Sequence, residues 1–344
     1  MKMKNHGIIY MKMCLFCLLL VFLFHHVFAE NAVKILPMPD LTKPGQIAID
    51  DSQIYITDDA EVCIYSLKEL TLKKKFGKRG EGPQEFVFQI DIAINVQTSN
   101  ILVLSTGKLS FFTKDGEFVK VLKYLPKYGK FTPVNGKFIG GGSRNTPEYT
   151  GVTLNFFDRE LNFQKEIYYL GIPRYKDKRL FLYTPWDFHT YNGKVFLAAE
   201  ADFKINVFDD TGKELTVITH DYERVKVTDE LRNRFLNWVK KYRPPNYYDF
   251  FKRYIKFPDY FPAVLQMRVD DGKIYVLTYK EKGDGTCEFV VFDTNGKFVK
   301  QVYVPFEKSD PVHVMPFTVS QGKLYQLVDN EETEEYELHI VSIL

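Results

Sequence analysis

A pair of turn residues followed by a short run of β-forming residues recurs six times along this chain. The six pairs are Asp51-Ser52, Ser99-Asn100, Asn135-Gly136, Asn192-Gly193, Asp271-Gly272 and Gln321-Gly322. Asn-Gly and Asp-Gly favour tight β-hairpins, because both central residues of a type I′ turn take positive φ. A second set of β-rich segments lies one strand later, centred on Tyr65, Phe112, Phe157, Phe208, Phe292 and Val341.

The centres of the second set are 47, 45, 51, 84 and 49 residues apart. Units of four antiparallel strands repeating every 40 to 50 residues or so are typical of β-propeller blades. Residues 228–256 account for the wide gap, because Thr228 can cap a helix and apolar residues then recur at helical spacing up to Pro244-Pro245. The repeat therefore predicts an all-β, six-bladed β-propeller with a helical insertion between blades four and five.

The two ends of the mature chain are predicted to meet in the last blade. The chain stops at Leu344 after the third strand of the sixth unit, which leaves that blade without its outer strand. Residues 32–38 form an extended apolar run before blade one and can supply the missing strand, which removes an open sheet edge. We therefore expect residues 30–344 to form one domain.

The first 29 residues have the pattern of a signal peptide. Three lysines precede an apolar run from Met13 to Phe24, and Val27-Phe28-Ala29 fits a cleavage site after Ala29. The run of about 12 residues is shorter than the roughly 20 that span a bilayer. We expect an exported protein, periplasmic or extracellular, with no transmembrane span. Cys14 and Cys17 do not follow the small residues of a lipoprotein signal.

Charge and cysteine content argue against a nucleic-acid-binding protein and against a scaffold held together by disulfides. Without the three leader lysines, 43 basic residues face 44 acidic ones, so the mature chain has no excess of positive charge to attract nucleic acid. Only Cys63 and Cys287 remain, and they fall in blades one and five, too far apart to bond. We predict that both thiols are free and that the protein is a monomer whose stability comes from its hydrophobic core.

One motif carries a resemblance to a known family. Residues 76–86, Phe-Gly-Lys-Arg-Gly-Glu-Gly-Pro-Gln-Glu-Phe, resemble the F-G-x-x-G-x-G-P-x-E-F signature of exported bacterial six-bladed β-propellers related to NHL-repeat proteins. The resemblance implies the fold and export but no reaction. Relatives of the NHL type include amidating lyases and lactonase-like metal hydrolases, so an enzyme stays an alternative by analogy.

Aligning the six innermost strands predicts the lining of a central tunnel. The strands are aligned on one apolar position in each second strand. Six residues before that position are small or polar residues, namely Ala48, Asn95, Thr132, His189, Arg268 and Thr318. Two residues earlier are Gln46, Lys130, Asp187 and Gln266. The alternate positions are apolar: Ile47, Ile94, Phe131, Phe188, Met267 and Phe317. Period-two alternation places the apolar set between blades. The polar set either binds a ligand or, with water, satisfies the inner strand edges.

Catalytic signals are weak. His189 and His313 fall on or near innermost strands, but no spacing selects a third zinc ligand among Asp187, Asp91 and Glu85. The chain has no G-x-S-x-G nucleophile motif, and the glycine-rich 76–86 segment lacks the G-K-[ST] of a phosphate-binding loop. We assign no catalytic residue and no metal or other cofactor, while a divalent metal remains an alternative.

The long connections all fall on one face of the predicted propeller, and long loops on a rigid scaffold often carry recognition. The insertion there is rich in aromatic residues interspersed with arginine and lysine, a composition common at interfaces. The predicted ligand-binding residues at the tunnel mouth are Lys78, Arg79, Asp187, His189, Trp238, Tyr260 and Arg268. The sequence thus favours an exported, non-catalytic propeller that binds an unidentified ligand or protein on this face; the alternative is an NHL-like metal-dependent lyase or hydrolase at the tunnel.

Overall fold

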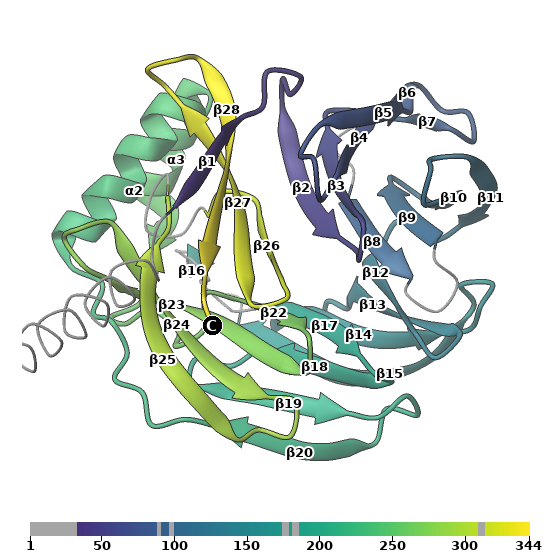
Figure 1. Cartoon of the computed structure of the whole chain (residues 1–344). Helices are drawn as coiled ribbons and strands as arrows, with labels where there is room; N and C mark the ends of the chain where they lie inside the picture. The colour runs from purple at the N-terminus through teal and green to yellow at the C-terminus, as the bar shows by residue number, and fades with distance from the viewer. Residues whose placement is uncertain (1–32, 88–90, 96–99, 174–178, 181–185, 309–313) are drawn as a thin grey trace, which may run out of the picture.

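The computed structural model describes residues 33–344 except 88–90, 96–99, 174–178, 181–185 and 309–313. Six four-stranded antiparallel sheets stand around a common axis, which confirms the predicted six-bladed β-propeller (Figure 1). Blades one to three comprise β2 (Pro44–Ile49), β3 (Gln53–Asp58), β4 (Glu61–Ser66) and β5 (Leu72–Phe76); β8 (Asp91–Asn95), β9 (Asn100–Ser105), β10 (Lys108–Thr113) and β11 (Phe118–Lys123); and β12 (Tyr128–Val134), β13 (Lys137–Ser143), β14 (Tyr149–Phe157) and β15 (Phe163–Pro173).

Blades four to six follow the same order from the axis outwards. They comprise β17 (Asp187–Tyr191), β18 (Lys194–Ala198), β19 (Lys204–Phe208) and β20 (Glu214–Thr219); β22 (Gln266–Asp270), β23 (Lys273–Glu281), β24 (Thr286–Asp293) and β25 (Phe298–Pro305); and β26 (Phe317–Ser320), β27 (Lys323–Asn330), β28 (Glu335–Ser342) and β1 (Lys34–Pro37). The turns between first and second strands have the predicted geometry, with φ of 46° at Asn192 and 72° at Gly193.

Strand β1 closes the ring as the sequence predicted. It pairs antiparallel with β28, with Lys34 opposite Ile340 and Leu36 opposite Leu338. The N–H of Met38 continues the contact by donating to the carbonyl of Tyr336 at 2.7 Å. The N-terminal strand therefore supplies the outer edge that the C-terminal blade lacks.

Apolar layers between the blades hold the ring together. The inner-strand residues Ile47, Phe131, Phe188, Met267 and Phe317 are all buried, as the alternation predicted, while the side chain of Ile94 lies outside the described residues. Cys63 and Cys287 are buried free thiols, also as predicted. Burial raises the pKa of both thiols, to about 12 for Cys63.

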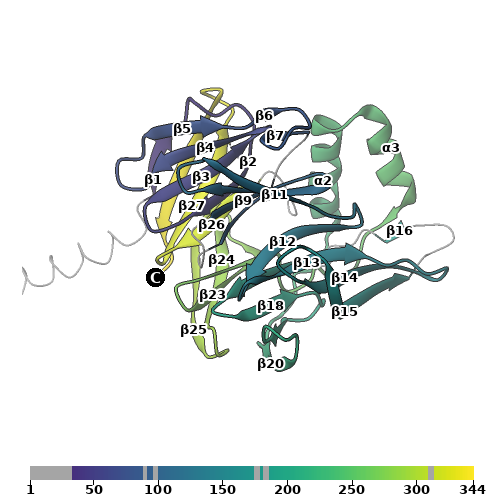
Figure 2. The same ribbon diagram turned by 90° about the vertical axis from the view of Figure 1, so that its right-hand side faces the viewer.

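The insertion contains two helices, where the sequence pattern outlined one helical stretch. Helix α2 (Asp229–Tyr242) begins at Thr228, whose Oγ1 accepts a hydrogen bond from the N–H of Leu231 at 3.3 Å. Helix α3 (Pro245–Tyr254) follows, with a proline at its first position. In Figure 2 the helices and the C-terminus lie on opposite sides of the ring. No described helix is long and apolar enough to cross a membrane.

Candidate functional site

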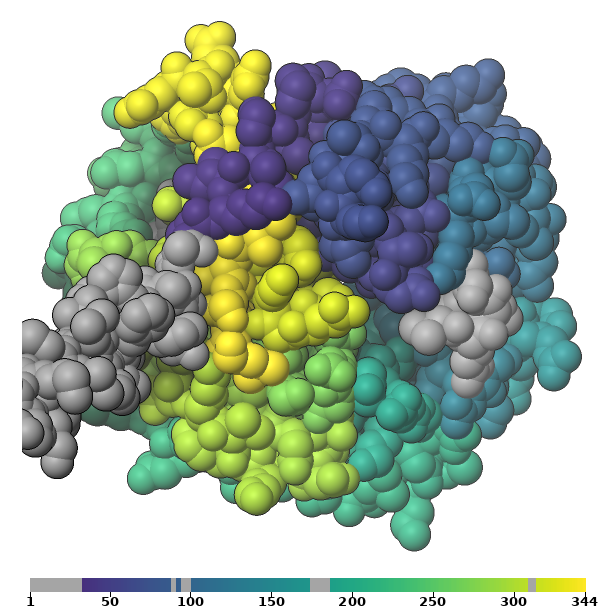
Figure 3. All heavy atoms as spheres, viewed as in Figure 1, coloured from purple at the N-terminus to yellow at the C-terminus, as the bar shows by residue number. Residues whose placement is uncertain are grey.

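A cavity of about 1090 Å³ lies on the propeller axis, walled by the inner strands of all six blades. Its lining includes residues before the inner strands, such as Trp186 and Leu265, and residues of the turns that follow them, such as Asp271 and Gln321. The cavity therefore follows the tunnel along the length of these strands. On the face seen in Figure 3, the surface is hollowed near the centre of the ring.

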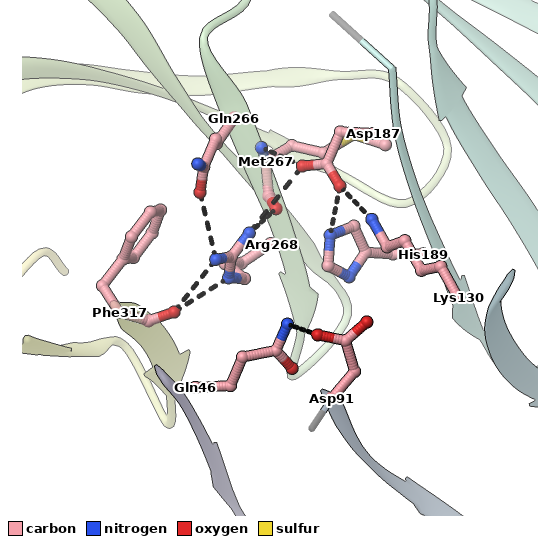
Figure 4. Close-up of polar contacts among 9 residues, drawn as sticks. All are labelled: Gln46, Asp91, Lys130, Asp187, His189, Gln266, Met267, Arg268 and Phe317. Carbon is pink, nitrogen blue, oxygen red and sulfur yellow. Dashed lines mark hydrogen bonds and ion pairs between the residues drawn. The ribbon is translucent and has the colours of Figure 1, made fainter. Parts of the chain in front are cut away.

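Asp187, the first residue of β17, is the centre of a polar cluster in this tunnel (Figure 4). Its Oδ1 lies 2.6 Å from Nζ of Lys130 in β12, and its Oδ2 accepts a hydrogen bond from the N–H of Met267 in β22 at 2.8 Å. Burial acts to raise the pKa of the Asp187 carboxyl, but Lys130, His189 and Arg268 outweigh it and hold that pKa well below its usual range. Asp187 is therefore ionised at neutral pH and links blades three, four and five.

Arg268 extends the cluster to blade six. Its Nε and Nη2 donate to the carbonyl of Phe317 at 3.1 and 3.0 Å, and its Nη1 donates to the carbonyl of Met267 at 2.7 Å. Nη2 also donates to Oε1 of Gln266 at 3.2 Å, and the guanidinium lies over the Phe317 ring. These contacts occupy most of the five N–H groups of the guanidinium. Arg268 therefore contributes positive charge and rigidity, with little capacity left for a ligand.

His189 lies beside Asp187 on the same strand. Its Nε2 is buried 3.3 Å from Oδ1 of Asp187 but is not aligned for a hydrogen bond. Burial lowers the pKa of His189 from its ordinary value, against the opposing effect of Asp187, so the imidazole is neutral at pH 7. The neighbouring carboxylate favours a proton on Nε2, which leaves Nδ1 as an acceptor. In Figure 4, Nδ1 points away from Asp187, towards Asp91.

Gln46 and Asp91 form a second polar pair, which joins blades one and two. Nε2 of Gln46 donates to Oδ1 of Asp91 at 2.7 Å, and its Oε1 accepts from the N–H of Ile92 at 3.0 Å. Burial raises the pKa of Asp91, while the charge of Lys130 acts in the opposite direction. Within the part of the chain that the structure describes, Oδ2 of Asp91 accepts no hydrogen bond. Among the described residues, this oxygen is therefore the acceptor of the pair that a bound molecule can use.

Three of the seven sequence-predicted site residues meet in the tunnel, namely Asp187, His189 and Arg268. Lys78 and Arg79 do not line it. They form the short strand β6 (Lys78–Arg79), which pairs with β7 (Glu85–Phe86). Lys78 forms an ion pair with Glu85 at 3.1 Å, and the guanidinium of Arg79 donates to both carboxylate oxygens of Asp59 at 2.7 and 2.9 Å. Both side chains thus stabilise the loop that leads into blade two.

Two glycines of this loop have positive φ and little space for a side chain. A Cβ on Gly80, whose φ is 153°, would lie 2.2 Å from Oε2 of Glu85, and one on Gly77 would contact the ring of Phe86 at 2.7 Å. Nζ of Lys108 donates to carbonyls of the loop, including that of Gly82 at 2.5 Å. The motif at 76–86 therefore forms a tight crossing between blades one and two.

Trp238 and Tyr260 also lie outside the tunnel lining. Trp238 is partly buried on α2 beside the guanidinium of Arg243, and Tyr260 is 45% exposed after the helices. The insertion instead contacts the outer loops of blades five and six, through ion pairs from Arg234 to Glu281 and from Lys241 to Glu331, each at 2.7 Å. Four of the seven predicted residues, Lys78, Arg79, Trp238 and Tyr260, therefore do not line the tunnel cavity.

The site list drawn from the sequence omitted Lys130, Asp91 and Gln46, although two of them were expected in the lining. The period-two alternation of the inner strands was the signal that could have placed all three in the tunnel. The side chain of Asn95 and the whole of His313 lie outside the described residues. Within the described ranges, no group of three His, Cys, Asp or Glu side chains is arranged to hold a metal ion.

Comparisons with known proteins show the fold alone. No protein-family model and no curated protein sequence matches the chain. A solved structure of a Bacteroides fragilis NCTC 9343 protein that is described as exported is 12% identical, with a TM-score of 0.55, over 91% of this chain and 96% of that one. A DUF4221 family member from Bacteroides vulgatus is 12% identical, with a TM-score of 0.52, over 91% of this chain and 98% of that one.

Proposed function

We propose that the protein is an exported, non-catalytic binding protein whose central tunnel holds a small polar ligand. One observation carries the proposal: three polar groups on the cavity have hydrogen-bonding capacity that no described residue fills. They are Nζ of Lys130, Nδ1 of His189 and Oδ2 of Asp91. A few convergent polar groups in a concave, preformed space are the usual composition of a small-molecule site.

The surrounding network supports binding more than catalysis. Asp187 is engaged by Lys130 and by the N–H of Met267, so its carboxylate positions neighbours and is a poor acceptor for a substrate proton. Lys130 is 44% exposed and forms one ion pair among the described residues, which holds its ammonium in place and leaves N–H groups for a ligand. Such preorganisation reduces the entropy cost of binding.

Export is supported by two independent features. Residues 1–29 carry the lysine-rich, apolar and small-residue pattern of a signal peptide. The Bacteroides fragilis protein that shares the fold is itself described as exported.

The insertion offers a second candidate function, the binding of a protein partner. Helix α3 has no buried residue, and Tyr242, Tyr247 and Tyr254 are 49%, 46% and 40% exposed. Exposed tyrosines among arginines are common at interfaces. A variant with Tyr247→Ser and Tyr254→Ser is expected to lose a partner that the native protein co-purifies, and an unchanged partner set contradicts this second function.

The tunnel site is tested with a panel of small sugars, amino acids, organic acids and amides, using saturation-transfer NMR on the mature protein. We expect one class to bind and Lys130→Met to weaken its binding at least tenfold. Lys137→Met is the matched control, because Lys137 is an exposed lysine on the adjacent strand of the same blade. Absence of binding by every class, or equal binding by both variants, would overturn the proposal.

A further inference from the structure

Within the polar cluster itself, cationic and anionic side chains are matched in number, which restricts the ligand that can bind there. Lys130 and Arg268 supply two positive charges opposite the carboxylates of Asp187 and Asp91, and His189 is neutral, whereas Asp50, Asp51, Lys114, Asp270 and Asp271 line other parts of the tunnel. A ligand with a net charge would leave one charge without a partner in a partly dehydrated space, which costs free energy. A neutral ligand avoids that cost.

The hydrogen-bonding groups that a tunnel ligand can use are donors on one side of the cluster and acceptors on the other. Lys130 offers N–H donors, whereas Nδ1 of His189 and Oδ2 of Asp91 offer acceptors. Figure 4 shows Asp91 and Nδ1 of His189 facing each other, with Lys130 on the far side of the imidazole. A carboxylate suits the donor side, and an ammonium suits the acceptor side.

We infer that the tunnel ligand is a zwitterionic amino acid, with its carboxylate on Lys130 and its ammonium on Asp91 and His189. This inference rests on the proposed function, because it names the ligand class of the same site. An ammonium with three N–H groups can donate to both acceptors at once. The cavity of about 1090 Å³ leaves space along the axis for the rest of the molecule.

The experiment compares probes that carry one charge, both charges or neither. Glycine, β-alanine and γ-aminobutyrate are zwitterions of increasing charge separation, acetate and methylammonium each carry one of the charges, and acetamide carries none. Affinities are measured by NMR titration of the mature protein. We expect at least one zwitterion to bind ten times more tightly than acetate, methylammonium and acetamide.

Two variants assign the two ends of the ligand. Asp91→Asn keeps a side-chain oxygen that can accept from Gln46 but removes the charge, so we expect it to weaken zwitterion binding about tenfold while acetate binding is retained or improved. Lys130→Met is expected to do the reverse and favour methylammonium. Asp249→Asn is the matched control, because Asp249 is an exposed carboxylate on α3. A cooperative thermal unfolding transition well above the temperature of the titration shows that each variant is folded.

The failures of the two proposals are distinguishable. If sugars or acetamide bind and depend on Lys130, but no zwitterion binds more tightly than acetate, the amino-acid inference is wrong and the tunnel site stands. If Asp91→Asn leaves zwitterion binding unchanged, the inference is also wrong. If no molecule in either panel binds, both proposals fall.

Discussion

Strand β1 and the α2–α3 insertion both lie outside the regular order of strands along the chain, but they are integrated into the ring to different extents. β1 has 4 residues and completes the sheet of blade six, and Met38 just beyond it is 3% exposed. The two helices have 14 and 10 residues, of which only Phe235 and Val239 are buried. The shorter addition therefore belongs to the ring, whereas the longer one is attached to it.

This difference indicates that the place of a segment in the ring, rather than its length, determines how much it contributes to stability. A strand at the closing point completes a sheet and covers the apolar layer between blades six and one, where Met38 and Leu36 pack against Leu327 and Leu338. An appended helix is stabilised locally by one apolar stripe. The polar cluster in the tunnel belongs with the ring, because its hydrogen bonds and ion pairs join four blades.

The largest effect is expected from removing β1. A mature protein that starts at Pro39 loses the buried Met38, the partly buried Leu36 and the pairing with β28. Its free energy of unfolding should fall by about 3–6 kcal/mol, from the transfer of these side chains to water. Denaturant unfolding measures this, and replacing residues 229–254 by a short linker should cost less. A larger loss from the helix deletion would reverse the comparison.

Asp187→Asn breaks the ring from inside the tunnel. The change leaves Lys130 and Arg268 without their carboxylate, and fully buried ion pairs lose about 3–5 kcal/mol in such cases. We expect about 2–3 kcal/mol, because Lys130 is 44% exposed and can be hydrated. Asp249→Asn on the insertion should change the free energy of unfolding by less than about 0.5 kcal/mol. Equal effects of the two changes would contradict the assignment of the cluster to the ring.

Acid should weaken the ring in two stages. The pKa of His189 is lowered in the folded protein, so the unfolded chain takes up this proton first and stability falls as the pH drops below the ordinary value of 6.5. The pKa of Asp187 is lowered from 3.8, so its contribution is present above that value and is lost as the pH falls further. Denaturant unfolding at several pH values should show that His189→Gln removes the first stage only; an unchanged first stage would refute the assignment.

The smallest effect is expected from Tyr260→Ala next to the insertion. Tyr260 is 45% exposed, and the guanidinium of Arg224 lies 5.6 Å from its ring centroid. We expect a change in the free energy of unfolding within about 0.5 kcal/mol, as for most surface substitutions. A loss above about 1 kcal/mol, measured by denaturant unfolding, would show that the insertion is part of the ring after all.

The architecture was predictable because its signals are local. Asn192-Gly193 predicts a hairpin from the φ preferences of two adjacent residues, and the alternation of Phe188 and His189 predicts opposite faces of one strand. Thr228 and Pro244 bracket a helix for equally local reasons. Six repetitions of such signals predicted a closed ring and the tunnel positions of Asp187, His189 and Arg268 within it.

The partners of those side chains were decided by the tertiary structure alone. Lys130 reaches Asp187 across 57 residues of sequence, Gln46 reaches Asp91 across 45, and Arg268 reaches the carbonyl of Phe317 across 49. Strand alternation determines which way a side chain points, but closure of the ring determines which residue it meets. For the same reason the sequence predicted Arg79 as a ligand-binding residue at the tunnel mouth, whereas in the fold its guanidinium donates to the carboxylate of Asp59.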